Sequence, residues 1–368
     1  MNKTRHVLGI SGGKDSAALA IYLKTKYPEL DLEFYSSDTG KELEETYQLI
    51  QNLEIYLGIK IDILKGAENS SEVPFDHFLK MYGGYLPSSS VRWCTKKLKL
   101  EPFEKYVGTD NVISYVGIRG DEDREGYIST KKNIQSIFPF RKNIWSEDVV
   151  LRALSNKNIE QIISFSKNID FGKYQDKATQ IISKKIDSSF TQKQKLNALL
   201  DTDVKGFNQL VFNFLKTTDY PLSREDSFPL IDNEDVLVKD DIFRILKESG
   251  VGVPAYYNEI EFEVNGKKGQ YARSRSGCFF CFYQQKIEWV WLYEQHPDLY
   301  KRAMEYEKDG YTWAQGESLE DIIKPERIEQ IKEEYIKRME RKSKNAKSPF
   351  LIDILGEEED VGCASCFI

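Results

Sequence analysis

The amino-acid sequence predicts an α/β protein built on a doubly wound, mostly parallel sheet, with a helical insertion and a cysteine-containing C-terminal helical region. Three observations support this prediction. Short apolar runs end in glycine-rich or polar turns, helix-forming stretches follow these turns, and a Lys- and Asn-rich segment with helical spacing interrupts the pattern. Strands of a parallel sheet are short and apolar because helices cover both faces of the sheet.

The composition indicates a globular protein with a substantial core. The chain has 368 residues, of which 40% are hydrophobic and 12% aromatic, enough for two domains or for one domain with insertions. The net charge of −7 argues against a uniformly basic protein that coats nucleic acid, although it allows local basic patches. No apolar run approaches the roughly 18 residues of a membrane span, and the first residues contain no signal-like apolar stretch. We therefore expect a soluble, cytoplasmic protein without membrane contact.

The first predicted strand, Val7–Ile10, is connected to a predicted helix at 17–23 by a glycine-rich loop. Paired glycines allow backbone N–H groups to turn toward one point, and the N-terminus of the helix adds a positive dipole end. Two serine hydroxyls and a lysine ammonium group supply further donors. The sequence therefore predicts an anion-binding loop that consists of Ser11, Gly12, Gly13, Lys14, Asp15 and Ser16.

A second predicted strand, residues 32–37, ends in the polar turn Asp38-Thr39-Gly40, and a helix is expected to start near Glu44. In doubly wound sheets, ligands bind beyond the carboxyl ends of the strands, so this turn should face the anion-binding loop. Asp38 could instead cap the following helix, a role that does not conflict with a place in the site.

Two more strands follow in the predicted sheet. Residues 59–64 alternate as expected for a partly exposed edge strand, and the Gly-, Ser- and Pro-rich stretch 66–90 predicts a surface loop near the site. Residues 112–118 form a fourth strand that leads into Arg119–Arg124. Arginines at the end of such a strand are suited to clamp phosphate or sulfate through two parallel hydrogen bonds.

The loop Ser11–Ser16 differs from a Walker A loop and resembles the PP-loop, S-G-G-x-D-S, of the ATP pyrophosphatases, which have an adenine nucleotide alpha hydrolase-like fold. Three further segments resemble the phosphoadenosine phosphosulfate (PAPS) reductase branch of this PP-loop superfamily: Asp38–Thr46, Arg92–Pro102 and Gly117–Arg124. In that superfamily the loop holds the β- and γ-phosphates as pyrophosphate while a substrate attacks the α-phosphate.

The resemblance implies ATP and Mg²⁺ as cofactors, with Asp38 as a magnesium ligand. It implies catalytic roles for Lys14, Asp15, Asp38 and Arg119. It also implies a nucleotide site composed of Ser11, Gly12, Gly13, Lys14, Asp15, Ser16, Asp38, Thr39, Gly40, Gly117, Arg119 and Arg124.

Four of the five cysteines lie in two CxxC pairs, Cys278/Cys281 and Cys363/Cys366. A CxxC turn presents two thiolates to one tetrahedral centre, and such pairs indicate a metal or redox site in a reducing compartment. The neighbouring Arg273 and Arg275 are expected to lower the pKa of the thiols. A disulfide-exchange site is the rival interpretation, but no thioredoxin-like pattern accompanies the pair.

Two metal arrangements fit the cysteines. In the first, Cys94, Cys278 and Cys281 hold a [4Fe–4S] cluster, whose fourth iron is open or bound by a tail cysteine. In the second, the two CxxC pairs form a zinc site and leave Cys94 free. We favour the cluster, because Cys94 lies in the segment that resembles the cluster-binding branch. A sulfur relay through a persulfide is an alternative role for the tail pair.

The chain is expected to divide into a PP-loop core at 1–145, a helical insertion at 146–222, a continuation of the core with the CxxC motif at 223–315, and a C-terminal helix and tail at 316–368. The insertion is expected to carry specificity or a partner surface. In the continuation, the stretch from Phe228 through Tyr257 resembles a further segment of the PAPS reductase family, and the aromatic helix 287–293 is predicted to be core.

The function implied by the resemblance is ATP-dependent sulfur transfer. PAPS reductases usually have a degraded loop and a C-terminal E-C-G-I/L-H motif, whereas this chain keeps the complete loop and lacks that motif. It therefore looks more like the DndC-type members, which take part in inserting sulfur into the DNA backbone. The implied partners are a nucleic-acid acceptor, a cysteine desulfurase and other subunits of a modification system. The resemblance also implies a role in phage defence. Sulfonucleotide reduction and an ATP-binding regulatory or defence subunit are the alternatives, and DNA, tRNA and a small molecule all remain open as acceptors.

Overall fold

The computed structural model describes residues 3–122, 129, 131–308 and 310–345, and its centre is a five-stranded parallel sheet with the order β3-β2-β1-β4-β5. This sheet confirms the predicted α/β fold. The third strand starts two residues later than expected, and the sequence pattern missed the last strand. The strands are β1 Arg5–Gly9, β2 Leu32–Asp38, β3 Ile61–Lys65, β4 Val112–Tyr115 and β5 Ile134–Ile137.

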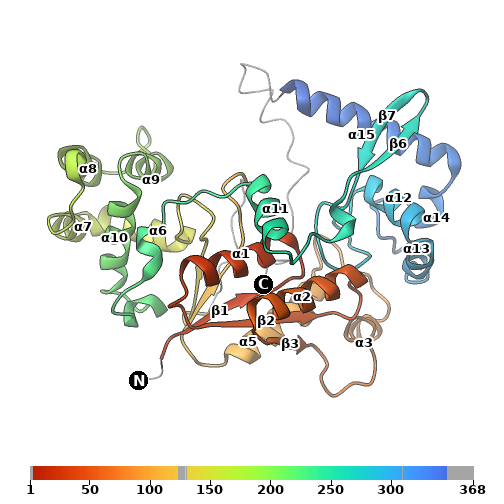
Figure 1. The fold of residues 1–368 in the computed structure, drawn as a ribbon, viewed down its shortest axis with the longest axis horizontal. Coiled ribbons are helices and arrows are strands. Elements are labelled where there is room, and N and C mark those ends of the chain that lie inside the picture. The colour runs from red at the N-terminus through yellow and green to blue at the C-terminus, as the bar shows by residue number, and fades with distance from the viewer. Residues whose placement is uncertain (1–2, 123–128, 130, 309, 346–368) are drawn as a thin grey trace.

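Neighbouring residues of each strand point to opposite faces of the sheet, and helices cover both faces. Leu8 of β1 packs in the core that contains helices α1 (Lys14–Lys26) and α2 (Glu44–Leu57). Val7, one residue earlier, packs in a separate cluster with α5 (Glu101–Val107). Figure 1 shows α1 and α5 on opposite sides of the strands.

The strand order places the candidate site. Strand β1 pairs with β2 on one side and with β4 on the other, all parallel. The order therefore reverses between β1 and β4, and in open α/β sheets the crevice at this reversal is the usual ligand site. The loops that follow β1 and β4 meet there.

Residues 66–90 are not only a loop, as the sequence suggested. They contain α3 (Pro74–Met81), whose residues Phe75 and Phe78 are buried. The helix starts with a proline, which is favoured at the first helical position because its missing N–H is not needed there. Two short elements follow, α4 (Trp93–Thr95) and a π-helix at Lys96–Leu100.

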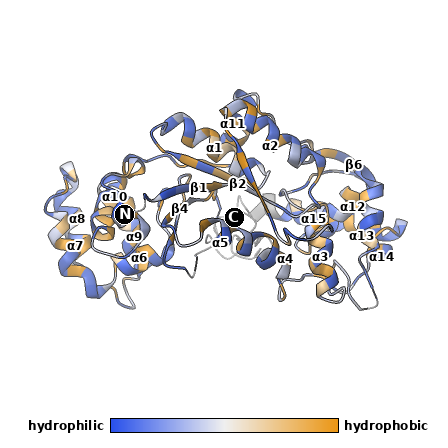
Figure 2. Ribbon diagram, turned by 90° about the horizontal axis from the view of Figure 1, so that it is seen from below, coloured by the Kyte–Doolittle hydropathy of each residue, from blue (hydrophilic) through white to orange (hydrophobic). Residues whose placement is uncertain are grey.

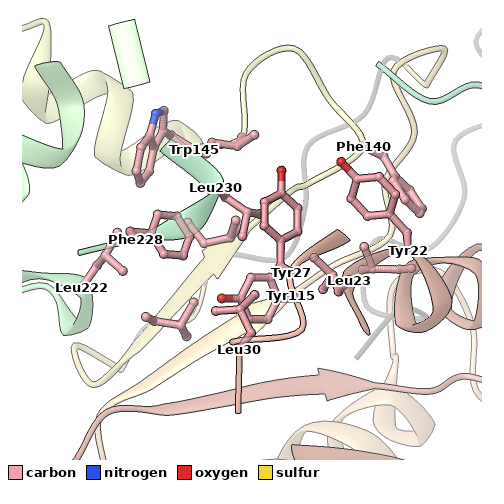
Figure 3. Close-up of a cluster of buried hydrophobic side chains, with 14 of the residues drawn as sticks. Tyr22, Leu23, Tyr27, Leu30, Tyr115, Phe140, Trp145, Leu222, Phe228 and Leu230 are labelled. Atoms are coloured by element: carbon pink, nitrogen blue, oxygen red, sulfur yellow. The ribbon is translucent and has the colours of Figure 1, made fainter. Parts of the chain in front are cut away.

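The segment after β5 forms a helical lobe, which lies at one end of the molecule in Figure 1. Its core is continuous with that of the sheet: Trp145 and Phe228 pack in the same cluster as Tyr115 of β4, and Figure 3 shows these rings with Tyr27 of the α1–β2 connection. The helices of the lobe are α6 Glu147–Ala153, α7 Ile159–Ser166, α8 Gln175–Ser183, α9 Gln192–Leu200 and α10 Val204–Leu215.

Lys195 of α9 is a buried lysine of this lobe with 1% exposure, and its Nζ donates to the carbonyl oxygens of Ile182 and Lys184, each at 2.7 Å. Burial lowers the pKa of Lys195 from 10.5 to about 8. Between these two pH values the unfolded chain binds a proton that the folded chain does not, so the stability should rise with pH in that window.

We expect the free energy of unfolding, measured by urea titration from pH 7.5 to 10.5, to rise with pH in the wild type relative to Lys195→Met. Lys193→Met removes an exposed lysine of the same helix and is the control, which should follow the wild type. Parallel pH profiles for the wild type and Lys195→Met would contradict the burial effect.

The chain returns from the helical lobe along α11 (Lys239–Glu248), which packs against α1, and then enters a second lobe. This lobe starts with an antiparallel hairpin that the sequence analysis missed, and its aromatic helix is core, as predicted, with Trp289 and Trp291 buried. Its elements are β6 Ile260–Val264, β7 Lys267–Tyr271, α12 Lys286–Gln295, α13 Pro297–Met304, α14 Leu319–Ile322 and α15 Pro325–Asn345. Single 3₁₀ turns occur at 156–158, 172–174, 221–224, 229–232 and 255–257.

Helices of both lobes alternate hydrophilic and hydrophobic residues (Figure 2), as expected for helices that bury one face. Within the described residues, no helix combines the length and the apolar character that crossing a bilayer would need.

Candidate functional site

The loop between β1 and α1 is shaped by two glycines that accept no side chain. Gly12 has φ +67°, in the left-handed region, and a Cβ there would lie 2.2 Å from Cγ2 of Thr46. A Cβ on Gly13 would lie 2.5 Å from Oγ of Ser276. Side chains from two distant parts of the chain thus lie against the loop, and at Gly12 the left-handed backbone also favours glycine.

The two serines of the loop bond to the loop itself. Ser16 Oγ lies 3.1 Å from Ser11 Oγ, accepts the N–H of Ser11 at 3.1 Å and donates to the carbonyl oxygen of Gly13 at 3.2 Å. Ser16 is buried. Its hydroxyl therefore fixes the curvature of the loop, which determines where the backbone N–H groups point.

Lys14 and Asp15, the first residues of α1, form a buried ion pair. The two residues are 6% and 5% exposed, and Lys14 Nζ lies 2.9 Å from Oδ2 of Asp15. Arg119, from the loop after β4, places Nη1 2.7 Å from Oδ1 of the same carboxylate. Burial alone would raise the pKa of Asp15, but the two cations outweigh it and hold the pKa below its ordinary value. Asp15 is therefore ionised and holds both cations beside the loop.

All three guanidinium nitrogens of Arg119 face carboxylates. Besides the contact with Asp15, Nε lies 2.9 Å from Asp121 and Nη2 lies 3.0 Å from Glu122. These contacts engage three of the five N–H donors of the guanidinium group. The second arginine expected at this position, Arg124, lies outside the described residues.

The turn after β2 brings Asp38 to the same end of the sheet. Oδ1 of Asp38 accepts the N–H of Gly40 at 2.8 Å and the hydroxyl of Tyr47 at 3.1 Å. Gly40 has φ +74°, which explains the glycine. The carboxylate thus caps its own turn, and Lys65 of β3 lies 3.4 Å from its other oxygen. Gly117, after β4, packs against the start of α1, since its Cβ would lie 3.0 Å from the carbonyl oxygen of Asp15.

The CxxC segment is joined to this turn. Thr39 Oγ1 lies 3.2 Å from Sγ of Cys278, and Cys278 forms an antiparallel bridge with Glu42. The N–H of Phe279 donates to the carbonyl oxygen of Lys41 at 2.8 Å. We call residues 273–281 the cysteine loop. It lies beside the loop Ser11–Ser16, which we call the phosphate loop, because a Cβ on Gly13 would lie 2.5 Å from Oγ of Ser276.

No disulfide links the three described cysteines, Cys94, Cys278 and Cys281, and Cys281 influences the pKa of the other two. Burial raises the pKa of Cys94 to about 12, and Cys281 adds to this shift. Burial, followed by the carboxylate of Glu42, raises the pKa of Cys278. The predicted lowering of the thiol pKa by two arginines is therefore wrong for Cys278. Arg273 instead donates to the carbonyl oxygen of Cys278 at 3.0 Å and lies over the ring of Trp291.

The structure describes only part of the predicted ligand set. Cys281 is close enough to Cys94 and to Cys278 to contribute to the pKa shift of each, but among the described residues no three His, Cys, Asp or Glu side chains are arranged as a metal site. The tail cysteines, Cys363 and Cys366, lie outside the described residues. The cluster and the zinc site thus both stay predictions.

Sequence reasoning missed several residues that complete the site. Glu42 accepts the hydroxyl of Thr39 at 2.6 Å and the hydroxyl of Tyr47 at 3.0 Å. Tyr256 and Tyr257 contact the phosphate loop from the 3₁₀ turn Ala255–Tyr257. The resemblance of residues 253–257 to a family segment was the available signal for the tyrosines. No local pattern marks Glu42 or Ser276.

Known proteins match part of the chain. It is 38% identical to an uncharacterized protein of Methanocaldococcus jannaschii over 142 residues, which are 38% of this chain and 27% of that protein. It is 29% identical to the tRNA-specific 2-thiouridylase MnmA of Hydrogenovibrio crunogenus over 134 residues, which are 33% of this chain and 35% of that enzyme. The chain thus spans about a quarter to a third of the length of these two relatives.

A solved structure, PAPS reductase from Candida auris in a phosphate complex, is 20% identical, with a TM-score of 0.29, over 39% of this chain and 68% of that chain. The family model of the phosphoadenosine phosphosulfate reductase domain matches residues 5–161. Residues 5–161 are therefore similar to the phosphoadenosine phosphosulfate reductase domain of the PP-loop superfamily.

Proposed function

We propose that this protein is an ATP-dependent sulfur-transfer enzyme that adenylates an acceptor oxygen and releases pyrophosphate. One observation carries the proposal: the complete phosphate loop lies beside the loop that carries the CxxC thiol Cys278. Ser276 of the cysteine loop touches Gly13, and Cys278 lies 3.2 Å from Thr39. A reductase that receives an activated nucleotide has no need of the complete loop, whereas an enzyme that cleaves ATP and then transfers sulfur needs both parts.

In this proposal the acceptor oxygen attacks the α-phosphate of ATP and pyrophosphate leaves. Lys14 and the loop N–H groups stabilise the charge on the leaving pyrophosphate, as fixed donors do for other oxyanions. Asp15 keeps Lys14 in place, since it pairs with the ammonium group in a buried site. Asp38 would bind Mg²⁺, whose preferred ligands are oxygens. The backbone of Thr39, Gly40 and Gly117 would line the nucleotide site with Arg119 and Arg124 at its edge.

The sulfur chemistry is assigned to the cysteines. Cys94, Cys278 and Cys281 would hold a [4Fe–4S] cluster, with Cys363 or Cys366 as a fourth ligand, and zinc is the alternative. When bound, the cluster would supply a binding site for sulfur. In the second half of the reaction a sulfur nucleophile displaces AMP from the adenylated acceptor. The raised pKa values of Cys94 and Cys278 mean that metal binding must release their protons.

A nucleic acid is the proposed acceptor. The similarity to a protein named tRNA-specific 2-thiouridylase supports this choice, and the resemblance to DndC-type proteins points to DNA phosphorothioation. A cysteine desulfurase would deliver the sulfur, and other subunits of a modification system would complete the reaction. A role in phage defence rests on the DndC resemblance alone.

The cysteines can be tested by anaerobic purification, with an absorption spectrum and analysis of iron, sulfide and zinc. We expect roughly four iron and four sulfide per chain in the wild type and none in Cys278→Ser. Cys94→Ser separates the two metal arrangements: it should lose the cluster, whereas a zinc site made of the two CxxC pairs would keep its zinc. Stoichiometric zinc without iron in the wild type would refute the cluster.

The reaction class needs a second assay. Release of pyrophosphate that depends on ATP and is stimulated by nucleic acid supports the proposal. Thiol-dependent release of sulfite from a sulfonucleotide would instead identify a reductase, and binding of ATP without turnover would identify a regulatory or defence subunit.

A further inference from the structure

Two adjacent tyrosines, Tyr256 and Tyr257, contact the phosphate loop. The hydroxyl of Tyr256 donates to the carbonyl oxygen of Gly12 at 3.1 Å. The hydroxyl of Tyr257 accepts the N–H of Lys14 at 3.5 Å, and Lys14 Nζ lies 4.7 Å from the centre of the Tyr257 ring. Both tyrosines are buried, and their rings are in contact, with centroids 4.6 Å apart. They come from a segment more than 240 positions away in the chain.

The same tyrosines contact the cysteine loop. The N–H of Arg273 donates to the carbonyl oxygen of Tyr256 at 2.9 Å, and Arg273 also holds the carbonyl oxygen of Cys278. Burial raises the pKa of Tyr257, so its phenol keeps its proton and can donate one bond while it accepts another. The tyrosine pair therefore connects the phosphate loop with the cysteine loop.

We propose that Tyr257 is a positioning residue that holds Lys14 in place for the leaving pyrophosphate. This inference rests on the proposed function. The ammonium group of Lys14 has three N–H donors, of which one bonds to Asp15, and the face of the Tyr257 ring restricts the rest of its motion. A charge that is already in place when the reaction starts stabilises the transition state without reorganisation. The contact from the Lys14 N–H to the ring hydroxyl is long, at 3.5 Å, so the ring rather than the hydroxyl is expected to carry the effect.

The test compares Tyr257→Leu, which removes the ring, with Tyr257→Phe, which removes only the hydroxyl. We expect Tyr257→Leu to lower kcat for ATP-dependent pyrophosphate release about 30-fold, the equivalent of about 2 kcal/mol for a desolvated cation–π contact. The KM for ATP should change less than about threefold, because the contact matters most when charge develops on the leaving group. Tyr257→Phe keeps the ring and should stay within about threefold of the wild-type kcat.

A matched control removes a hydroxyl elsewhere in the same lobe. Tyr300 is also buried, and its hydroxyl donates to the carbonyl oxygen of Leu319 at 2.7 Å, with no contact to the phosphate loop. Tyr300→Phe should leave kcat unchanged. A loss of kcat in Tyr300→Phe as large as in Tyr257→Leu would overturn the inference, because the effect would then be a general loosening of the lobe.

A double-mutant comparison asks whether Tyr257 acts through Lys14. In the Lys14→Met background, Tyr257→Leu should lower the residual rate less than about twofold, since residues that act as one unit are not additive. A full additional 30-fold loss in that background would contradict the positioning role.

Failure of the proposed function is recognised separately. If the wild type binds ATP but releases no pyrophosphate, the proposed reaction is wrong, and the inference is then judged by calorimetric binding of inorganic pyrophosphate. Tyr257→Leu should weaken that binding at least tenfold, and Tyr300→Phe should not. Equal binding of inorganic pyrophosphate by Tyr257→Leu and the wild type would overturn the inference. Failure of the wild type to bind either ATP or inorganic pyrophosphate would overturn it as well.

Discussion

Substitution of Lys14 by methionine should lower kcat for ATP-dependent pyrophosphate release by about 10²–10³-fold, the usual cost of removing one donor from a developing oxyanion. Methionine keeps the unbranched side chain and removes the charge. The remaining partner of Asp15 is Arg119, at 2.7 Å, so the start of α1 keeps one ion pair and should still fold. The measurement is a coupled pyrophosphate assay with thermal unfolding of each variant.

Lys24, in the last turn of the same helix, provides the matched control. It lies at the opposite end of α1 from the phosphate loop. Lys24→Met should retain wild-type kcat and melting temperature. Unchanged pyrophosphate release in folded Lys14→Met would remove this lysine from the mechanism and, with it, the proposed use of the loop.

Replacement of Arg119 by leucine should lower the free energy of unfolding by about 3–5 kcal/mol, the range found when one partner of a buried ion pair is removed. Asp15 is 5% exposed and would keep only Lys14. Asp121 and Glu122 would lose their shared cation and repel each other. Urea unfolding at pH 7 measures the change.

An exposed ion pair of the helical lobe gives the comparison. Arg152 lies 3.2 Å from Asp219, and both side chains are at least half exposed. Arg152→Leu should cost no more than about 1 kcal/mol, as is usual for surface pairs. If the two arginine variants lost the same small amount of stability, the network around Asp15 would not be part of the folded core.

The charges of this network bear on how ATP would bind. Two cations, Lys14 and Arg119, are shared among three carboxylates, Asp15, Asp121 and Glu122. The network therefore has no excess positive charge to offset a triphosphate. This balance is consistent with the proposed role of Mg²⁺, and with an exchange in which phosphate oxygens take the place of Asp121 or Glu122 on the arginine.

The local sequence determined the sheet and the loops at its carboxyl edge. Runs such as Val7–Ile10 are apolar and short, the glycines that follow allow a left-handed turn, and these signals lie within a few neighbouring residues. For the same reason the phosphate loop and the turn at Asp38–Gly40 could be predicted. The strand Ile134–Ile137 was missed because IQSI is short and half polar, and its partner β4 in the sheet decides its conformation.

Only the tertiary structure brought the second half of the site together. Gly12 and Lys14 meet Tyr256 and Tyr257 across more than 240 positions, and Gly13 meets Ser276. No periodicity in the sequence records such contacts, because they depend on how segments that are distant in the chain pack together at the edge of the sheet. Burial also reversed the predicted pKa shift of Cys278, since an apolar environment disfavours a thiolate more than distant cations favour it. Sequence patterns report what neighbouring residues do to one another, whereas desolvation and long-range contacts exist only after the chain has folded.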